Sequence, residues 1–482
     1  MKITGRLIQQ TPLIHFQKEK DRKPELALRV SEVKPKLDRF IRLWYKKHNQ
    51  EKQIPDDWYT ESETSKQADD RSKALNYKMR IIPTNNYIAE FPNENVYFGN
   101  MGDMVVPKEQ IIFKEPLRIE IVSFVEKLFT TIEECLPTFF LVTNFGTRQD
   151  KGFGCFILEM NENAANDAEN NQTEKKLNKD VINDAEDRLK KWYGDIHYIK
   201  IDYSDVRSNV NEKIERKKNG KKIKVDGINY WLDEIGTIYK LIKSGINMGG
   251  DYVKSALTDF FLNREVQIVG EKRAMKEYGV APKAKKPEDE AKKPEDETKK
   301  PEDEKGNKIG EEKSKNQAEI SEENCRYIRG LLGYGDTQMW FDESFEHKVI
   351  IKVRPYEAKK NNEDKDNNDI ENVDNQSSSY KRIPSPLLFK VVGKCIFILQ
   401  EYMDDRIFGK IYVFKGRTEK KFKIPEEKEF DLNKFIIWLA DWLRPSNGEY
   451  QRNQVTIEEI PHDFENEKCI IELIPSKGGS HS

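Results

Sequence analysis

One loop of the sequence combines flexible backbone with positive charge. Residues 144–154 read NFGTRQDKGFG, which places the cations Arg148 and Lys151 among three glycines. Glycine lets the backbone take positive φ and approach a ligand closely, and an arginine guanidinium matches the spacing of phosphate oxygens. The glycines are Gly146, Gly152 and Gly154. The composition is compatible with phosphate binding, but on composition alone we favour an ordinary basic turn before a strand.

A second basic segment precedes this loop in the chain. Apolar residues recur at three- and four-residue spacing from Val33 to Tyr45, which predicts a helix with one buried stripe. The remaining face carries two acids, Glu32 and Asp38, and a larger set of cations. These cations are Lys34, Lys36, Arg39, Arg42, Lys46 and Lys47. Such a face can contact nucleic-acid phosphates or can simply be solvated, and its combination with the Gly/Arg loop favours a polyanion partner.

Enzymatic chemistry has little support in the sequence. No H-E-x-x-H, G-x-S-x-G or zinc-ligand spacing occurs. His15, at the end of the first expected strand, is the candidate for general acid/base attack on RNA, but no second His or Tyr is spaced to assist it. We therefore favour a polar loop histidine, and we expect no catalytic residue, metal or cofactor.

The overall charge hides an uneven distribution. The 482 residues contain 83 Lys and Arg against 85 Asp and Glu, giving a formal net charge of −2. Three stretches that look unable to form a core, 161–187, 279–323 and 356–380, carry net charges of −5, −3 and −4. Without them the net charge changes from −2 to +10, as expected of a protein that meets a polyanion.

The acidic stretch 279–323 repeats KKPEDE at positions 285, 292 and 299. Each repeat contains proline and lacks a large apolar residue, so a coiled coil is excluded and a solvated insertion is expected. No apolar run approaches the ~18 residues of a membrane span, and the first residues lack a signal-peptide pattern. We expect a cytoplasmic protein, without membrane contact, whose five cysteines are reduced.

The expected elements divide the chain into two α+β units. Residues 1–160 alternate as strand, helix, strand, helix, Gly-rich loop and strand, which suggests a ferredoxin-like or RRM-like domain. An acidic loop at 161–187 follows. A second domain of similar plan is expected over 188–482, with disordered insertions at 279–323 and 356–380. Its expected elements include a strand at Leu387–Leu399 and a helix at Leu432–Leu443 that Asp431 is placed to cap. One apolar helix, expected over 125–142, contains Pro137, which should strain or break it.

Several segments, in this order, resemble the RAMP superfamily of CRISPR RNA-binding proteins, and within it the first subunit of the type III-B Cmr effector complex. The matching segments are the first strand ending in Thr11-Pro12, Leu28–Tyr45, Phe98-Gly99-Asn100, Asn144–Gly154 and Lys381–Leu388. The resemblance implies two ferredoxin-like RAMP domains in a non-catalytic subunit. Such a subunit would lie near the crRNA 3′ region and help to capture target RNA in antiviral defence.

The resemblance also implies partners and site residues. The partners are crRNA, target RNA and other Cmr or RAMP subunits of a ribonucleoprotein, and exposed aromatics such as Phe145 would stack on bases. The implied RNA-binding residues are Lys34, Lys36, Arg39, Arg42, Asn144, Phe145, Gly146, Arg148, Lys151, Gly152, Phe153, Gly154 and Arg382. The alternatives are a metal-independent RAMP endoribonuclease that processes crRNA, another RAMP subunit of a type III complex, and an architectural subunit that contacts only proteins.

Overall fold

The structure is a computed structural model of the chain. It describes residues 1–15, 28–49, 53–60, 74–84, 86–90, 110–160, 171–203, 214–218, 221–225, 227–248, 251–262, 268–280, 324–333, 337–341, 348–356, 384–444 and 470–474. Nearly all of the insertions expected at 279–323 and 356–380 lie outside these ranges. Among the described helices, none is long and apolar enough to cross a membrane.

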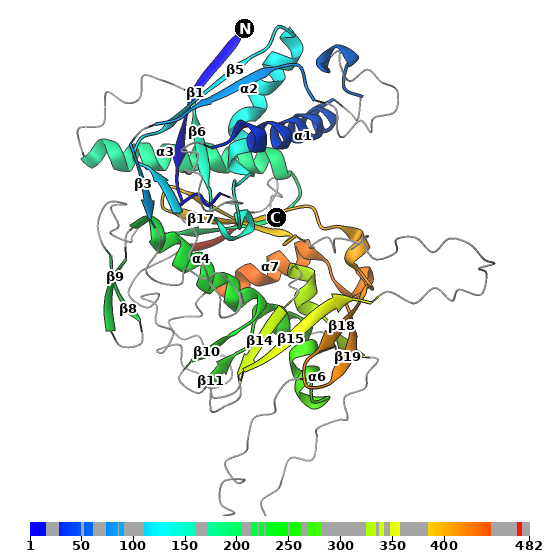
Figure 1. Ribbon diagram of the computed structural model, residues 1–482. Coiled ribbons are helices and arrows are strands. Elements are labelled where there is room, and N and C mark those ends of the chain that lie inside the picture. Colours follow the sequence, from blue (N-terminus) through cyan, green and yellow to red (C-terminus); the bar gives the residue numbers. More distant parts are fainter. Residues whose placement is uncertain are drawn as a thin grey trace, which may run out of the picture.

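The first domain is built on a four-stranded antiparallel sheet in the order β2-β5-β1-β6 (Figure 1). Its elements are β1 (Lys2–Gln9), α1 (Val30–His48), β2 (Lys78–Ile82), β3 (Tyr87–Glu90), β4 (Gln110–Phe113), β5 (Leu117–Val122), α2 (Glu126–Leu141) and β6 (Phe156–Glu159). Short 3-10 helices lie at Asp56–Trp58 and, as η3, at Gln149–Lys151. Apart from the inserted β3–β4 hairpin, this order and pairing are ferredoxin-like, which confirms the prediction.

Alternating residue types determine which face of this sheet is buried. Ile3 pairs with Ile121 and Leu7 with Leu117, and all four side chains lie on the side covered by α1 and α2. Each such burial contributes roughly 1.5–3 kcal/mol. The intervening residues of the same strands are mostly charged and lie on the opposite face.

Helix α2 continues through its proline. It runs from Glu126 to Leu141, so the expected break at Pro137 is wrong. Proline removes one backbone donor, but Leu136, Phe139 and Phe140 beside it are buried in the first-domain core. Their packing offsets the lost hydrogen bond and keeps the helix intact.

The second domain repeats the plan with the sheet order β16-β17-β7-β20, again fully antiparallel. Its elements are β7 (Tyr198–Asp202), α4 (Gly227–Lys243), β16 (Leu387–Val392), β17 (Cys395–Gln400), α7 (Leu432–Leu443) and β20 (Ile470–Ile474). The single strand signal at 387–399 is therefore a hairpin, which turns at Gly393 with φ +57°. Strand, helix, strand, strand, helix, strand is again ferredoxin-like, as predicted.

Two insertions in the second domain build an accessory sheet. The six strands, in the order β12-β13-β19-β18-β15-β14, come from segments between α4 and β16 and between β17 and α7. The inserted elements are β10 (Ile246–Met248), β11 (Asp251–Val253), α5 (Ala256–Leu262), β12 (Val269–Gly270), α6 (Glu271–Glu277), β13 (Cys325–Arg326), η7 (Ile328–Leu332), β14 (Thr337–Phe341), β15 (Lys348–Pro355), β18 (Ile411–Lys415) and β19 (Glu419–Lys423). Another hairpin, β8 (Ile214–Lys218) and β9 (Lys221–Val225), precedes α4.

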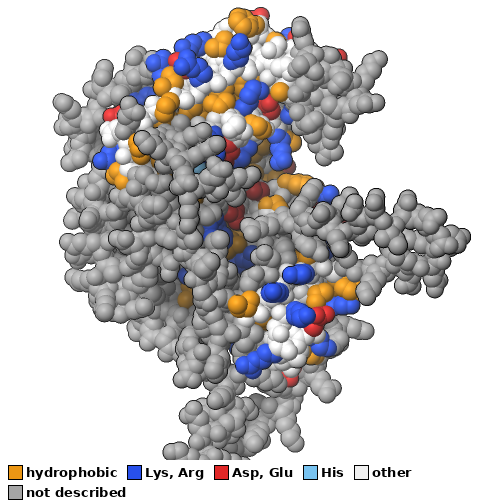
Figure 2. Space-filling view, in the orientation of Figure 1, with side chains coloured by type: hydrophobic (Ala, Val, Ile, Leu, Met, Phe, Trp, Pro, Cys, Tyr) orange, Lys and Arg blue, Asp and Glu red, His pale blue; other side chains and the backbone are white. Residues whose placement is uncertain are grey.

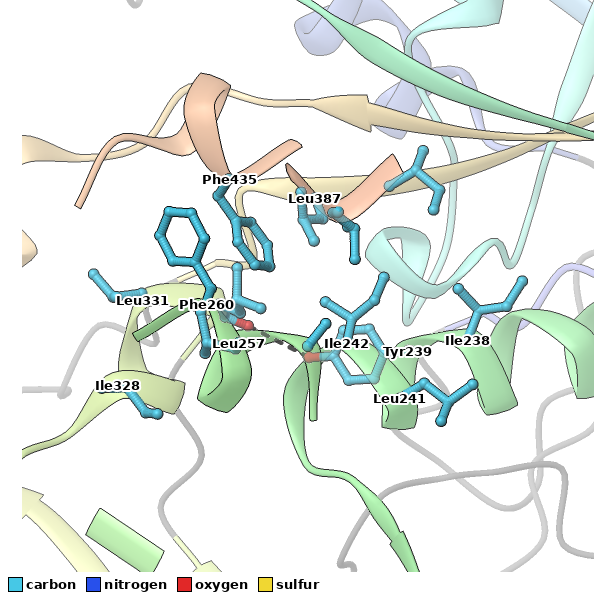
Figure 3. Close-up of a cluster of buried hydrophobic side chains, with 14 of the residues drawn as sticks. Ile238, Tyr239, Leu241, Ile242, Leu257, Phe260, Ile328, Leu331, Leu387 and Phe435 are labelled. Atoms are coloured by element: carbon cyan, nitrogen blue, oxygen red, sulfur yellow. Dashed lines mark hydrogen bonds between the residues drawn. The ribbon is translucent and has the colours of Figure 1, made fainter. Parts of the chain in front are cut away.

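One hydrophobic core joins the accessory sheet to the second ferredoxin-like unit. Figure 3 shows Tyr239 and Ile242 of α4 facing Phe260 of α5, Leu331 of η7 and Phe435 of α7. Tyr412 and Phe414 of β18, from the second insertion, belong to the same cluster. Because the cluster takes side chains from both insertions and from the repeated plan, the two parts fold as one apolar unit.

A long helix, α3 (Asn171–Tyr193), crosses between the two domains (Figure 1). The expectation of an acidic loop over 161–187 is therefore wrong for its second part. Ile182, Ala185 and Leu189 are buried at three- and four-residue spacing in a cluster that includes residues of both domains. High acidic content hid this apolar stripe, because the acids occupy the other faces of the helix.

Candidate nucleic-acid interface

The basic face of α1 contains cations that are engaged within the protein. Lys34 Nζ lies 3.1 Å from Asp38 Oδ2, donates to the Leu75 carbonyl at 3.1 Å, and sits 4.2 Å from the centroid of the Tyr77 ring. Asp38 is buried and also accepts from the Leu75 N–H at 3.4 Å. Lys34 and Asp38 thus fasten the helix to the segment that enters β2.

Lys36 is fastened in the same way to the Gly-rich loop. Its Nζ donates to Glu32 Oε1 at 3.0 Å, to the Asn144 carbonyl at 2.9 Å and to Gln149 Oε1 at 2.6 Å. Glu32 in turn accepts from the Gly146 N–H at 2.7 Å. The two helix acids therefore neutralise the two cations of the first turns, and the loop is held against α1.

The cations further along α1 form its outer ridge. We use the name α1 ridge for Arg39, Arg42, Lys46 and Lys47. Arg39, Lys46 and Lys47 are exposed, and the half-buried Arg42 guanidinium lies 5.9 Å from the centroid of the Tyr59 ring. Lys47 also donates to the Trp192 carbonyl and lies 4.9 Å from the centroid of the Trp192 ring. Lys46 and Lys47 also belong to the last helical turn, where positive charge favours the helix dipole. Neither helix acid belongs to this ridge.

The Gly-rich loop takes the left-handed conformations that its glycines predict. Gly146, Gly152 and Gly154 have φ of +79°, +77° and +64°, and Arg148 is left-handed at +59°. A Cβ at Gly154 would lie 2.0 Å from the Phe145 carbonyl oxygen, so side chains larger than hydrogen do not fit. The close approach that requires glycine is to the protein's own backbone.

The aromatic residues of the loop are core residues. Phe145 is fully buried and packs with Phe139, Phe140 and Phe156, so the expectation that it is exposed for base stacking is wrong. Phe153 is likewise buried, against Ile14 and Leu232 of α4. The sequence did not reveal this, because a Phe between small and polar residues has no periodic neighbours.

The other side of the loop docks on the second domain. Asn144 Nδ2 donates to the Phe389 carbonyl at 2.9 Å, and Asn144 Oδ1 accepts from Lys390 Nζ at 3.1 Å. Gly152 lies against Ile235 of α4, where a Cβ would come within 2.4 Å of a methyl carbon. The loop is thus a junction between α1, the first sheet and the second domain.

Lys390 of β16, which the sequence did not single out, completes this junction. It is fully buried, and its Nζ donates to the Thr143 carbonyl at 3.1 Å and the Phe156 carbonyl at 2.9 Å as well as to Asn144. Burial lowers the pKa of Lys390 to about 8. Three neutral oxygens from the first domain therefore solvate a lysine of the second.

Family models match along most of the chain. The model described as Cmr1 N-terminal domain matches residues 1–246, and the one described as Cmr1 C-terminal domain matches residues 252–459. The chain belongs to the Cmr1 family. It is accordingly a RAMP protein of the type III-B CRISPR system and a subunit of the Cmr complex. A comparison with curated proteins gives no match.

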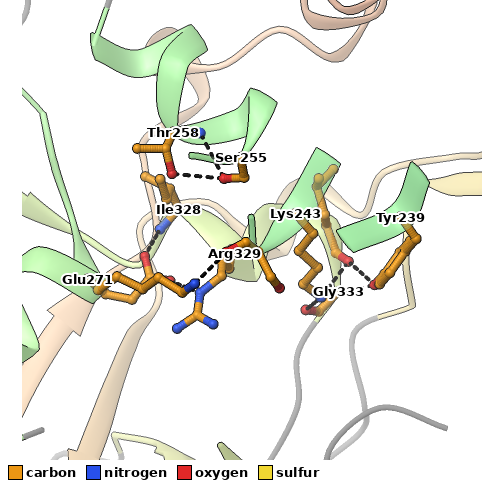
Figure 4. A network of polar contacts seen from close by, with 11 residues as sticks. Tyr239, Lys243, Ser255, Thr258, Glu271, Ile328, Arg329 and Gly333 are labelled. Atoms are coloured by element: carbon orange, nitrogen blue, oxygen red, sulfur yellow. Dashed lines mark hydrogen bonds and ion pairs between the residues drawn. The ribbon is translucent and has the colours of Figure 1, made fainter. Parts of the chain in front are cut away.

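Behind the loop, this Cmr1-family chain gathers further cations. The Lys151 ammonium lies 4.9 Å from the centroid of the Tyr239 ring, and Lys243 donates to the Tyr239 hydroxyl and to the Leu332 and Gly333 carbonyls. Burial lowers the pKa of Lys151, and burial together with Lys151 and Arg329 lowers that of Lys243 to about 7. Figure 4 shows Lys243 among these acceptors.

A buried carboxylate balances the neighbouring arginine. Glu271 of α6 accepts from the Ile328 N–H at 3.0 Å and forms an ion pair with Arg329 (Figure 4). Through Lys243 and Glu271 this network holds η7 against α4 and α6. Figure 2 shows that the hollow between the two domains is lined by side chains of both charges.

The remaining predicted residues have separate positions. His15 is buried, with 6% of its surface exposed, close to the loop through the Ile14 carbonyl that accepts from Thr147 N–H. Arg382 lies outside the described residues. In the described part of the chain, no group of three or more His, Cys, Asp and Glu is arranged to hold a metal ion.

The hairpin β8–β9 is a basic feature that the sequence analysis did not use. Its sequence, IERKKNGKKIKV over 214–225, contains six Lys and Arg against one Glu, and Asn219-Gly220 between two strand signals is a hairpin signature. The register places Lys217 opposite Lys222 and Lys218 opposite Lys221. Directly opposed like charges destabilise an antiparallel pair, so a polyanion near this hairpin would be stabilising.

Proposed function

We propose that this Cmr subunit binds RNA, both crRNA near its 3′ region and target RNA, without cutting it. The observation that carries the proposal is the α1 ridge of Arg39, Arg42, Lys46 and Lys47 in a family that belongs to a CRISPR ribonucleoprotein. Cations on one exposed helix face can each neutralise an RNA phosphate and release a counterion.

The internal ion pairs of α1 support this assignment. Glu32 pairs with Lys36 and the buried Asp38 pairs with Lys34, so both acids of α1 have cation partners outside the ridge. Helix α1 is also fixed to the Gly-rich loop by the Lys36 bonds and to β2 by the Lys34 bonds. In this proposal the loop holds the ridge in position, and the ridge meets the RNA.

The test is RNA affinity as a function of salt for the full chain. Arg39→Ala with Arg42→Ala should weaken binding of an unstructured single-stranded RNA, and it should reduce the slope of log Kobs against log salt by about 1.4, since each lost phosphate contact removes about 0.7 for single strands. A matched control, Lys434→Ala on α7 with Arg444→Ala directly after its C-terminus, removes the same charge from exposed positions of the second domain. Equal losses in both variants would contradict a specific role for the ridge.

The same preparation tests the alternative of an endoribonuclease. Repeat-containing RNA incubated with the protein should stay intact without added metal. Cleavage that disappears in His15→Ala but persists in the ridge variant would replace the binding proposal with catalysis. An isolated chain that shows no salt-sensitive RNA binding would instead indicate a subunit that contacts only proteins.

A further inference from the structure

The face of the first sheet that points away from α1 and α2 is uncovered over much of its area. Its outward side chains include five cations, Lys2, Arg6, Lys78, Arg80 and Arg118, and two carboxylates, Glu120 and Glu159. The five cations lie on three neighbouring strands, β2, β5 and β1, about 5–10 Å apart. In Figure 2, Lys and Arg side chains gather over the upper part of the first domain, where Figure 1 places β1 and β5.

The lower end of this face is closed. Ile8 and Ile157, the outward pair of β1 and β6 nearest the second domain, join the cluster formed by α3 and β16. The uncovered area is therefore the part of the face on the side of this pair that is farther from the second domain. Side chains of Lys2 and Arg118 there are 48% and 51% exposed.

Among the described side chains of this face, cations outnumber carboxylates. Glu120 lies 3.0 Å from Lys2 and 3.3 Å from Arg118, and Glu159 lies 3.2 Å from Arg6. Five described cations stand against these two described carboxylates, which is an excess of three positive charges on the described part of the face. Charge on an edge strand such as β2 prevents strand pairing between molecules, but β1 and β5 are inner strands and need no such protection.

An exposed aromatic side chain lies at one end of the same face. Lys2, Val122 and Lys78 form one row across the strands, and Phe124 follows two residues after Val122. Ser123 between them is buried, so Phe124 continues the alternation outward, and it is 89% exposed. Solubility alone explains a charged sheet face, but it does not explain a Phe beside the cations.

We infer that this face, Lys2, Arg6, Lys78, Arg80, Arg118 and Phe124, binds single-stranded RNA separately from the α1 ridge. The cations neutralise successive phosphates, and the Phe124 ring stacks on one base. The described residues of this face include one exposed aromatic ring and no amide side chain that could read base edges, so the contact is independent of RNA sequence. The inference extends the proposed function, since it adds a second RNA surface on the other side of the first domain.

Two variants of the full chain test the inference by anisotropy titration of an unstructured RNA of about 30 nucleotides. Lys78→Gln, Arg80→Gln and Arg118→Gln together should reduce the salt slope by about 2, because each lost phosphate contact removes about 0.7 for single strands. Phe124→Ala should weaken affinity about tenfold with the salt slope unchanged, and Phe124→Tyr should restore it. These exposed positions leave the core untouched.

Matched controls remove the same groups elsewhere. Lys415→Gln, Lys428→Gln and Lys434→Gln remove three exposed cations of the second domain, and Tyr402→Ala removes an aromatic ring that is 81% exposed there. Neither control should change RNA affinity by more than about twofold.

Combination with the ridge variant separates the two proposals. If both surfaces bind, the losses in log affinity from the ridge and sheet variants add. A sheet variant with wild-type affinity and salt slope, alongside a weakened ridge variant, overturns this inference and leaves the proposed function standing. Unchanged RNA binding with loss of assembly into the Cmr complex would identify the face as a protein contact and would also overturn it.

Discussion

The two ferredoxin-like sheets have the same strand order but different surroundings. In the first sheet, buried and accessible residues alternate along β1 and β5. In the second, all six residues of β16 and the first five of β17 are buried. Helices α4 and α7 cover one face of the second sheet, and α3 with the edge of the first domain covers the other.

The charged residues of the two sheets differ in where their partners come from. On the covered face of the second sheet, Lys200 Nζ lies 2.7 Å from Glu186 of α3 and 3.2 Å from Glu472 of β20. Lys390 on the same face has three neutral oxygen partners. A covered sheet must supply partners for each cation from the protein itself, whereas the first sheet keeps an excess that water solvates.

The largest expected loss of stability comes from a substitution that breaks the Lys390 junction on the covered face of the second sheet. Lys390→Ala should lower the free energy of unfolding by about 3–5 kcal/mol, because it leaves a cavity and three buried oxygens without their donor. Urea unfolding measures the change. The exposed Lys434→Ala on α7 serves as the control and should stay within about 0.5 kcal/mol. A Lys390 variant as stable as this control would show that the junction does not stabilise the fold.

Glycine substitution tests the loop at the same junction. Gly154→Ala should cost about 2–4 kcal/mol, because the new Cβ would meet the Phe145 carbonyl and φ is +64°. Gly194→Ala is the matched control, since its φ is +59° but nothing lies within 4 Å of the position that its methyl group would occupy. The control should cost only the ~1–2 kcal/mol of the left-handed conformation, measured by the same urea titration. Equal losses of stability in Gly154→Ala and Gly194→Ala would show that close packing around Gly154 adds nothing to the cost of the left-handed conformation.

The charge of Lys390 predicts a pH dependence. Its pKa is about 8 in the folded protein and 10.5 ordinarily, so between these values the unfolded chain holds a proton that the folded chain has released. Raising the pH from 7.5 to 9.5 should therefore increase the stability of the wild type relative to Lys390→Met by about 2 kcal/mol. If the stability of the wild type relative to Lys390→Met instead fell between pH 7.5 and 9.5, burial would not disfavour the charged form of Lys390.

The ion pairs of Lys200 should be worth less than the Lys390 junction. Burial alone would lower the pKa of Lys200, but hydrogen bonds to Glu186 and Glu472 outweigh it and hold the pKa above its ordinary value. Lys200→Met should cost about 1–3 kcal/mol in chemical denaturation at pH 7, because it leaves these carboxylates together. Arg118→Gln on the open face of the first sheet should cost less than about 0.5 kcal/mol. A larger loss of stability from Arg118→Gln than from Lys200→Met would contradict the contrast between the two sheets.

The smallest effect concerns the β8–β9 hairpin. Lys222→Glu places opposite charges across the strand pair with Lys217 and should stabilise the hairpin by about 0.2–1 kcal/mol, seen as slower amide hydrogen exchange. The same change should weaken RNA binding, because it removes positive charge. Unchanged or tighter RNA binding by Lys222→Glu would exclude a polyanion at the hairpin.

Sequence periodicity predicted the fold where local signals were complete. The helix expected at Leu432–Leu443 has those bounds in the structure, and Asp431 caps it by accepting from the Lys434 N–H at 3.0 Å. Cap and apolar stripe are both local, so no distant contact was needed. Helix α3 was missed because its composition is acidic, although Ile182, Ala185 and Leu189 carry a helical spacing.

The junction could not be predicted in the same way. Asn144 and Phe389 lie 245 residues apart, and neither has a neighbour whose spacing indicates the other. The glycines of the loop correctly indicated left-handed backbone. What they approach, whether a phosphate or the protein's own carbonyl, depends on the tertiary structure that brings Phe145 and Ile235 to them.

The strands of the second sheet are synthesised far apart in time. Lys200 of β7 and Glu472 of β20 lie 272 residues apart, so β7 leaves the ribosome long before its partner strands. The first domain has all four of its strands once Glu159 is made. We therefore expect the first domain to fold on the nascent chain while β7 is still without its partner strands. During this interval the unpaired β7 can form non-native strand pairs or aggregate.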